Sequence, residues 1–330
     1  MIPAPQQRFL QQTGITVPLI GGPMYPCSNP ELVAAVSKAG AIGVVQPISL
    51  TYVHGHEYRE GLRLIHRLAD GHPIGFNALV EKSSRVYEQR MIRWVEVAIE
   101  EGVRFFITSL GNPRWVVDRV HAVGGVVFHD VVNRHWGDKA RDGGVDGLIA
   151  VNNRAGGHLG DRDPRALFDE LAPLGLPLVS AGGVGNASEY VAQLALGYVA
   201  VQLGTRFIAT TECRTGDAYK QAIVAAKEPD IVSTERLSGV AVSVINTPYI
   251  QRLGTTVGPF ARWMFRGRKT KHWARTWYGL TGLWRLKRDQ QRGGAGTNEY
   301  WQAGRSVQTI DSIVPAGDVV RAFEAAWRAS

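Results

Sequence analysis

A single histidine flanked by glycines is the residue of this sequence best placed to do chemistry. His158 ends the run Ala155-Gly156-Gly157-His158, which directly follows the apolar run at 144–151. A strand that ends in small residues before an imidazole puts that ring at the mouth of a β/α unit, where ligands bind. A neutral imidazole can take a proton, and a protonated one can stabilise an anion. A histidine with a purely structural role in a loop is the alternative interpretation.

Two further glycine-rich turns follow the next two strand-like runs of the chain. They are Ser180-Ala181-Gly182-Gly183-Val184-Gly185 and Gln202-Leu203-Gly204-Thr205-Arg206-Phe207. Glycines let backbone N–H groups face an anion, and the start of a helix adds a favourable dipole. In barrels, the loops after strands 7 and 8 commonly bind a phosphate. Two such turns with the Thr205 hydroxyl predict a phosphorylated cofactor, whereas tight turns without a ligand are the alternative.

The elements that position these residues alternate between short apolar runs and longer helical patterns. Near-continuous apolar runs separated by helices predict a parallel sheet covered by helices. Eight units favour a closed (β/α)₈ barrel, the TIM-barrel form of the α/β class, over an open sheet. The eight runs are 17–20, 41–45, 74–80, 103–108, 125–130, 146–151, 176–183 and 198–204.

The repeating pattern ends at about residue 210, which divides the chain into three parts. We expect residues 1–225 to form the barrel and residues 226–295 to form a helical cap rich in basic and aromatic residues. Residues 296–330 should return to the barrel, and the apolar spacing over 314–328 predicts a closing helix.

Composition narrows the class of protein and its surroundings. Hydrophobic residues make up 45% of the 330 residues, which is enough for a large core. The two cysteines, Cys27 and Cys213, give neither a disulfide framework nor a metal cluster, so no metal is expected. The first residues lack the pattern of a signal peptide, and no apolar run is long enough to span a membrane. We therefore expect a cytoplasmic protein.

The net charge of +8 is concentrated in one segment, residues 262–292. Between Arg262 and Arg292, eight basic residues stand against Asp289 alone, and aromatic residues alternate with them. This composition suits an acidic carrier protein or peripheral contact with an anionic membrane surface. A lid with solvated charges is the alternative. Nucleic acid is not expected, because no recognised binding module accompanies the charge.

Five short motifs, taken together in their order along the chain, resemble those of the nitronate monooxygenases, formerly called 2-nitropropane dioxygenases. The resemblance extends to the related flavin-dependent enoyl-acyl-carrier-protein reductases. It covers about residues 15–225, with a weaker match at 301–306. The motifs are Gly21-Gly22-Pro23-Met24, Asn77, Ala155-Gly156-Gly157-His158, Ala181-Gly182-Gly183-Val184 and Gly204-Thr205-Arg206-Phe207.

The resemblance implies FMN inside the barrel, with a smaller helical domain over its mouth. Gly22 and Met24 would then lie against the isoalloxazine ring, and Asn77 would hydrogen-bond its edge. The two glycine-rich turns would hold the phosphate, and His158 would face the substrate as the catalytic residue. The cofactor-binding candidates are Gly22, Pro23, Met24, Asn77, Asp130, Ala155, Gly156, Gly157, Ala181, Gly182, Gly183, Gln202, Gly204 and Thr205.

For a nitronate monooxygenase, the resemblance implies oxidation of alkyl nitronates or nitroalkanes by O₂ to a carbonyl compound and nitrite. His158 would act as the base or stabilise the anion. One alternative is an NAD(P)H-dependent flavin reductase of quinones or enoyl thioesters. Another is a peripheral membrane or carrier-binding protein that keeps the barrel as a scaffold.

Three residues depart from the pattern of the family. Related reductases can carry lysine near the position of Asp130. With His129, Asp130 suggests a catalytic dyad, but a polar pair at the strand end that trims the flavin pocket, or a structural role, is the favoured interpretation. Arg154 and Arg305 add guanidinium groups that favour an anionic substrate or pair with Asp130 or Asp161.

Overall fold

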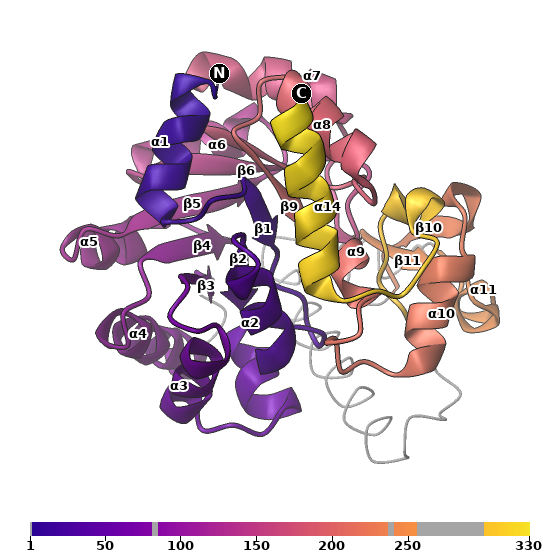
Figure 1. Ribbon diagram of the computed structural model, residues 1–330, viewed down its shortest axis with the longest axis horizontal. Helices are drawn as coiled ribbons and strands as arrows, with labels where there is room; N and C mark the ends of the chain where they lie inside the picture. The colour runs from indigo at the N-terminus through magenta and orange to yellow at the C-terminus, as the bar shows by residue number, and fades with distance from the viewer. Residues whose placement is uncertain (1, 81–84, 237–240, 256–299) are drawn as a thin grey trace.

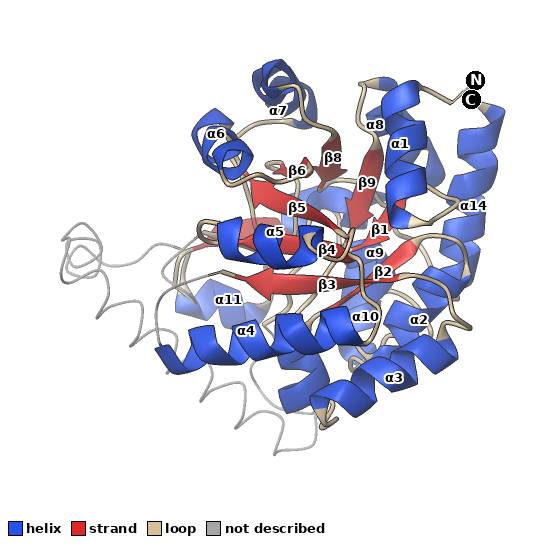
Figure 2. Ribbon diagram, turned by 90° about the vertical axis from the view of Figure 1, so that its left-hand side faces the viewer, coloured by secondary structure: helices blue, strands red, loops and turns tan. Residues whose placement is uncertain are grey.

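The computed structural model describes residues 2–80, 85–236, 241–255 and 300–330. Eight parallel strands form a closed barrel in the order β1-β2-β3-β4-β5-β6-β8-β9, and the pairing of β1 with β9 closes the ring. Helices surround the strands, whose arrows run side by side (Figure 2). The predicted (β/α)₈ barrel is confirmed. Its strands are β1 (Leu19–Gly21), β2 (Ile42–Val45), β3 (Ile74–Leu79), β4 (Phe105–Ser109), β5 (Val126–Val131), β6 (Gly147–Val151), β8 (Leu178–Ala181) and β9 (Ala200–Leu203).

Each barrel strand is followed by helical structure that returns the chain to the start of the next strand. The main outer helices are α2 (Pro30–Lys38), α3 (Tyr58–Leu68), α4 (Arg85–Glu100), α5 (Arg114–His121), α6 (Arg134–Asp142), α7 (Pro164–Leu171) and α8 (Ala187–Ala195). Shorter or later elements are the π-helix η1 (Ser49–Val53), the 3₁₀ turns η2 (Ala172–Leu174), η3 (Glu228–Asp230) and η4 (Arg305–Thr309), and the helices α9 (Thr205–Ile208) and α10 (Asp217–Ala225). Among the described residues, none of the helices is both long and apolar enough to cross a bilayer.

Successive side chains along each strand point alternately into the barrel interior and toward the surrounding helices. In β4, Phe105 and Ile107 belong to the interior cluster, whereas Phe106 packs in the cluster between strands and helices. The interior cluster also holds Phe128 of β5 and Val179 of β8, so the lower barrel is filled with apolar side chains. Burying each such side chain contributes roughly 1.5–3 kcal/mol. Ligand space is therefore confined to the carboxyl ends of the strands.

A helix that the sequence analysis did not expect, α1 (Ala4–Thr13), covers the amino-terminal end of the barrel. Its Phe9 is only 1% exposed and joins the interior cluster. The Phe9 ring meets Phe128 and Phe105 edge-on, with centroids 5.5 and 6.4 Å apart. Phe9 thus closes the barrel at the end opposite the predicted site.

The closing helix is confirmed as α14 (Ala316–Ala329), which lies beside α2 and α8 in Figure 1. Its Phe323 packs on Tyr190 of α8, with ring centroids 5.1 Å apart. The helix therefore completes the outer layer where β9 returns to β1.

The described part of the segment predicted as a helical cap also contains two strands, which the sequence did not lead us to expect. β10 (Ile231–Thr234) pairs with β11 (Val242–Ile245), and β11 pairs with β7 (Gly157–His158); the helix α11 (Pro248–Leu253) follows. β-Branched residues favour extended structure, and β7 offers an edge for β11 to pair with. The boundaries at 225 and 295 stay predictions, and the basic segment 262–292 lies outside the described residues.

We predict that Phe9→Ala destabilises the protein by about 3–5 kcal/mol, because it leaves a cavity in a closed apolar interior. Thermal unfolding followed by circular dichroism should show a midpoint lowered by roughly 5–10 °C. Gln7→Ala, an exposed change on the same helix, is the control and should leave the midpoint unchanged. A Phe9→Ala midpoint equal to that of the control would show that α1 does not stabilise the barrel.

Candidate functional site

Three polar side chains form the top layer of the barrel interior: Asn77 of β3, Asp130 of β5 and Gln202 of β9. Side chains two residues apart on a strand point to the same face of the sheet. Asp130 follows the interior residue Phe128 by two positions, and Gln202 follows Ala200 in the same way, so both point into the barrel. Gly75 also faces the interior, because a Cβ added to it would meet the interior residues Val44 and Phe105. Asn77, two residues later, therefore points into the barrel as well. All three lie toward the carboxyl ends of their strands, where barrel enzymes bind ligands.

Each of these side chains keeps one buried oxygen without a hydrogen-bond partner among the described residues. The atoms are Asn77 Oδ1, Asp130 Oδ1 and Gln202 Oε1. An unpaired buried polar atom costs about 1–3 kcal/mol, so three in one layer call for a ligand that pairs with them. The polar edge of an isoalloxazine ring has the hydrogen-bonding groups to do so, and the residues therefore fit a flavin.

His129 and Asp130 are neighbours in the sequence but point to opposite faces of the sheet. His129 faces away from the interior, where its Nδ1 lies 2.8 Å from the Thr108 hydroxyl, and burial lowers its pKa to about 4. Burial raises the pKa of the inward Asp130 to about 7. The suggestion of a catalytic dyad is therefore wrong, whereas the role of Asp130 in the flavin pocket stays a prediction.

The loop after β1 lies against the turn after β9. A Cβ at Gly22 would stand 2.9 Å from Gln202 Cγ, and one at Gly204 would stand 3.6 Å from Met24 Sδ. The Met24 N–H donates to Ser28 Oγ at 2.8 Å, which holds the loop containing Pro23 in this position. Glycine at position 22 thus lets the loop reach the top layer of the barrel.

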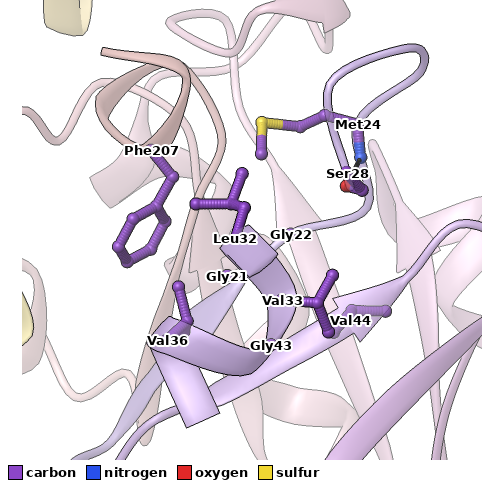
Figure 3. A pocket seen from close by; sticks show the side chains of 10 residues that line it. All are labelled: Gly21, Gly22, Met24, Ser28, Leu32, Val33, Val36, Gly43, Val44 and Phe207. Carbon is purple, nitrogen blue, oxygen red and sulfur yellow. Dashed lines mark hydrogen bonds between the residues drawn. The ribbon is translucent and has the colours of Figure 1, made fainter. Parts of the chain in front are cut away.

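A small hollow lies beneath this loop, between β1, α2 and α9. Figure 3 shows Met24, Leu32 and Phe207 around it, together with the backbone of Gly21 and Gly22. Its volume of about 10 Å³ is enough for a single water molecule. The hollow is a packing gap, and the candidate site is the polar layer above it.

His158 belongs to β7, where it pairs with Val242 of β11. Its side chain is exposed at the surface although protein surrounds it on most sides, and this desolvation lowers its pKa below the usual value. The imidazole is therefore mostly neutral at pH 7 and able to accept a proton. His158 follows β6, as predicted, but it lies in the short strand β7 rather than in a turn, and β11 fixes its backbone.

Three backbone segments approach one another so closely that only glycine fits at the contacts. A Cβ at Gly182, which has a φ of 118°, would lie 2.6 Å from Ala155 N. One at Gly156 would lie 2.7 Å from Gly304 N, and one at Gly304 would lie 2.6 Å from Arg154 O. The loop 154–157, the turn after β8 and the return segment at 303–305 therefore form one packed unit.

The Thr205 hydroxyl joins the turn after β9 to this unit by accepting the Gly304 N–H at 3.0 Å. Ala181, 5% exposed, ends β8 within the interior cluster, and Gly183 follows it with a φ of 81°. The predicted glycine turns thus meet at one end of the barrel. Their roles toward a cofactor stay predictions.

Two residues at the site were missed by sequence reasoning, Tyr300 and Gln302. Gln302 packs against Gly157, because a Cβ added to that glycine would stand 2.8 Å from Gln302 Oε1. The Nε2 of Gln302 donates a hydrogen bond to the Tyr300 hydroxyl at 2.7 Å. The weak motif match at 301–306 was the only signal for this segment. It did not indicate that the return segment packs on the loop of His158.

Arg154 and Arg305 pair with neither Asp130 nor Asp161. Both contact Glu228 of η3: Arg154 Nη2 lies 2.8 Å from Glu228 Oε2, and Arg305 Nη1 lies 3.3 Å from Glu228 Oε1. The alternative of a pair with Asp130 or Asp161 is wrong because Glu228, more than 70 residues from either arginine, folds back to them in the turn that precedes β10.

Comparison with known proteins agrees with this arrangement. A sequence model of the family described as nitronate monooxygenase matches residues 6–324. The chain is 28% identical over 275 residues to a nitronate monooxygenase of Pseudomonas aeruginosa, covering 70% of this chain and 77% of that one. It is 26% identical over 241 residues to a hydroxy-methyl-oxo-octahydroindene-carboxyl-CoA dehydrogenase of Rhodococcus jostii. That match covers 73% of this chain and 65% of the relative. This chain therefore spans less than two thirds of the length of that relative.

Solved structures share the fold over nearly the whole chain. FabK from Thermotoga maritima superposes with a TM-score of 0.77 at 24% identity, covering 98% of this chain and 96% of that one. A nitroalkane oxidase from Streptomyces ansochromogenes gives a TM-score of 0.74 at 20% identity, covering 97% and 98%. With a family match that spans almost all of the sequence, the chain belongs to the nitronate monooxygenase family, a family of flavin-dependent oxidoreductases.

Proposed function

We propose that this protein binds FMN at the carboxyl end of the barrel and oxidises alkyl nitronates or nitroalkanes with O₂ to a carbonyl compound and nitrite. His158 is the catalytic residue, as base toward a nitroalkane or as stabiliser of the nitronate anion. The observation that carries this proposal is a mostly neutral histidine in β7, which follows β6 at the end of the barrel where the layer of unpaired polar oxygens lies.

The residues present fit FMN in two regions of the site. Asn77, Asp130 and Gln202 would contact the polar edge of the isoalloxazine, with the loop of Gly22, Pro23 and Met24 against the ring. The glycine turns at 182–183 and 204–205 would hold the phosphate, because glycine turns that lead into helical segments can direct backbone N–H groups at an anion. Bound FMN would supply the electron transfer to O₂.

His158 does the proton chemistry in this proposal. A nitroalkane carries an acidic proton on the carbon next to the nitro group, and a neutral imidazole can remove it. The resulting nitronate is an anion, which an imidazolium then stabilises. The pairing of β7 with β11 fixes the backbone of His158, and Gln302 packs beside it on Gly157.

A second candidate function is reduction of a quinone or enoyl thioester by NAD(P)H. The relative named as a carboxyl-CoA dehydrogenase and the structural similarity to FabK favour it. The same pocket and the same histidine suit either chemistry. The two functions differ in the electron donor, which is the nitronate in one and NAD(P)H in the other.

We predict that His158→Asn lowers kcat/KM for a nitroalkane by about 10²–10⁴-fold, because the amide cannot take the proton. The loss should be much smaller for a preformed nitronate, which needs no proton removed. In the unaltered enzyme, nitroalkane turnover should fall as the pH drops through a value below 6.5, where His158 becomes protonated. This acid limb should be absent in the variant.

The matched control is His135→Asn, which changes an exposed histidine on α6 and should leave both activities intact. FMN content, measured by absorbance, should stay normal in both variants. Near-normal nitroalkane turnover by the His158 variant, or an unchanged acid limb, would exclude His158 as the base.

Gly183→Val should abolish FMN retention. The residue has a φ of 81°, which strains any other residue, and an added Cβ would lie 2.7 Å from Arg154 Nε, so a side chain must displace the turn or Arg154. Flavin content after purification measures the effect. Gly216→Ala is the control, because no atom lies within 4 Å of its added Cβ. Full flavin occupancy in Gly183→Val would contradict a phosphate site at this turn.

A further inference from the structure

The side chains of Arg154, Arg305 and Glu228 meet beside the turn after β8, and together they carry one net positive charge. Arg154 binds Glu228 with two hydrogen bonds, from Nη1 at 3.1 Å and from Nη2 at 2.8 Å. Arg305 adds a third, from its Nη1 to the same carboxylate at 3.3 Å. Two guanidinium groups thus share one carboxylate, and the excess positive charge lies next to the predicted cofactor site.

Arg154 lies directly on Gly183. Its Nε would be 2.7 Å from a Cβ at that glycine, and its Cδ would be 2.8 Å away. Glu228 engages only two of the five N–H donors that a guanidinium carries. Among the described residues, the Arg154 guanidinium makes its hydrogen bonds through Nη1 and Nη2 and none through Nε. The edge of the guanidinium next to the glycine turn therefore keeps free donors.

The position of Arg154 is fixed at several points. Its backbone N–H donates to Asn152 Oδ1 at 2.8 Å, and Asn152 Nδ2 donates to Gly182 O at 3.0 Å. The Arg154 carbonyl accepts the Arg305 N–H at 3.0 Å. These bonds tie the arginine to the glycine turn and to the return segment, which distinguishes it from a loose surface arginine.

Glu228 is equally constrained and acts as the counter-ion of the pair. Its backbone N–H donates to Gln308 Oε1 at 3.1 Å. The hydrogen bond from Arg154 lowers the pKa of Glu228, so the carboxylate stays charged at neutral pH. The side chains of Arg154, Glu228 and Arg305 are 29%, 32% and 44% exposed, so a pair this accessible adds little stability by itself. The geometry of the ion pair therefore indicates that Glu228 orients the Arg154 guanidinium rather than stabilising the fold.

We propose that Arg154, oriented by Glu228 and assisted by Arg305, binds the phosphate of the FMN cofactor and makes this protein select FMN over riboflavin. The inference rests on the proposed function, since it assumes a flavin in the barrel. A guanidinium suits a phosphate because its planar donors match two phosphate oxygens, and such charge-assisted bonds are about twice as strong as neutral ones. The glycine turns supply neutral N–H donors, and Arg154 supplies the charge.

The test compares the affinity of the full-length, flavin-free protein for FMN and for riboflavin, measured by quenching of flavin fluorescence. Arg154→Met removes the charge but keeps most of the aliphatic stem. It should lower the preference for FMN over riboflavin by about tenfold, with riboflavin affinity unchanged. Arg154→Lys should keep part of the preference, and added salt should weaken FMN binding more than riboflavin binding.

The control is Arg162→Met, which removes a nearby arginine between β7 and α7 that pairs with Glu170 instead. It should leave both affinities unchanged. Equal losses for FMN and riboflavin in Arg154→Met would make the arginine structural and overturn the proposal. An unchanged FMN preference with a raised KM for NAD(P)H would assign the phosphate to a substrate and also overturn it. Equal binding of the two flavins by the unaltered protein would refute this inference alone, whereas no binding of either would refute the proposed function.

Discussion

The close approach of three backbone segments, at Gly156, Gly182 and Gly304, is the constraint on which the candidate site depends. At each contact an added Cβ would lie 2.6–2.7 Å from a backbone atom of a neighbouring segment, so any other residue forces the segments apart. The contact joins the loop of His158, the turn after β8 and the return segment. Separation at one point would therefore disturb both the histidine and the predicted phosphate turn.

The barrel itself could be predicted because its signals are local. Each apolar run carries enough β-branched residues to indicate a strand, and the rules for parallel sheets then order the strands. The helix α1 and the strands β10 and β11 escaped prediction because their stability depends on distant partners. Phe9 is buried only because the barrel interior receives it, and β11 pairs with a two-residue strand that has no pattern of its own.

For the site, the sequence placed the glycines, Asn77, Asp130 and Gln202 at strand ends, but contacts across the chain decide their surroundings. His129 and Asp130 looked like a pair, and strand alternation separates them onto opposite faces. Glu228 carries no motif, and it meets Arg154 across 74 residues of sequence. The pairing of two arginines with that carboxylate follows from the packing of the return segment, which no spacing in the sequence reveals.

The most direct test of the proposed function follows the absorbance of the flavin-loaded protein without oxygen. One sample receives an alkyl nitronate and the other receives NAD(P)H. We expect the nitronate to change the flavin spectrum rapidly and NAD(P)H to leave it nearly unaltered over the same time. Rapid bleaching by NAD(P)H with an inert nitronate would contradict the proposed oxidation and make this protein a flavin reductase.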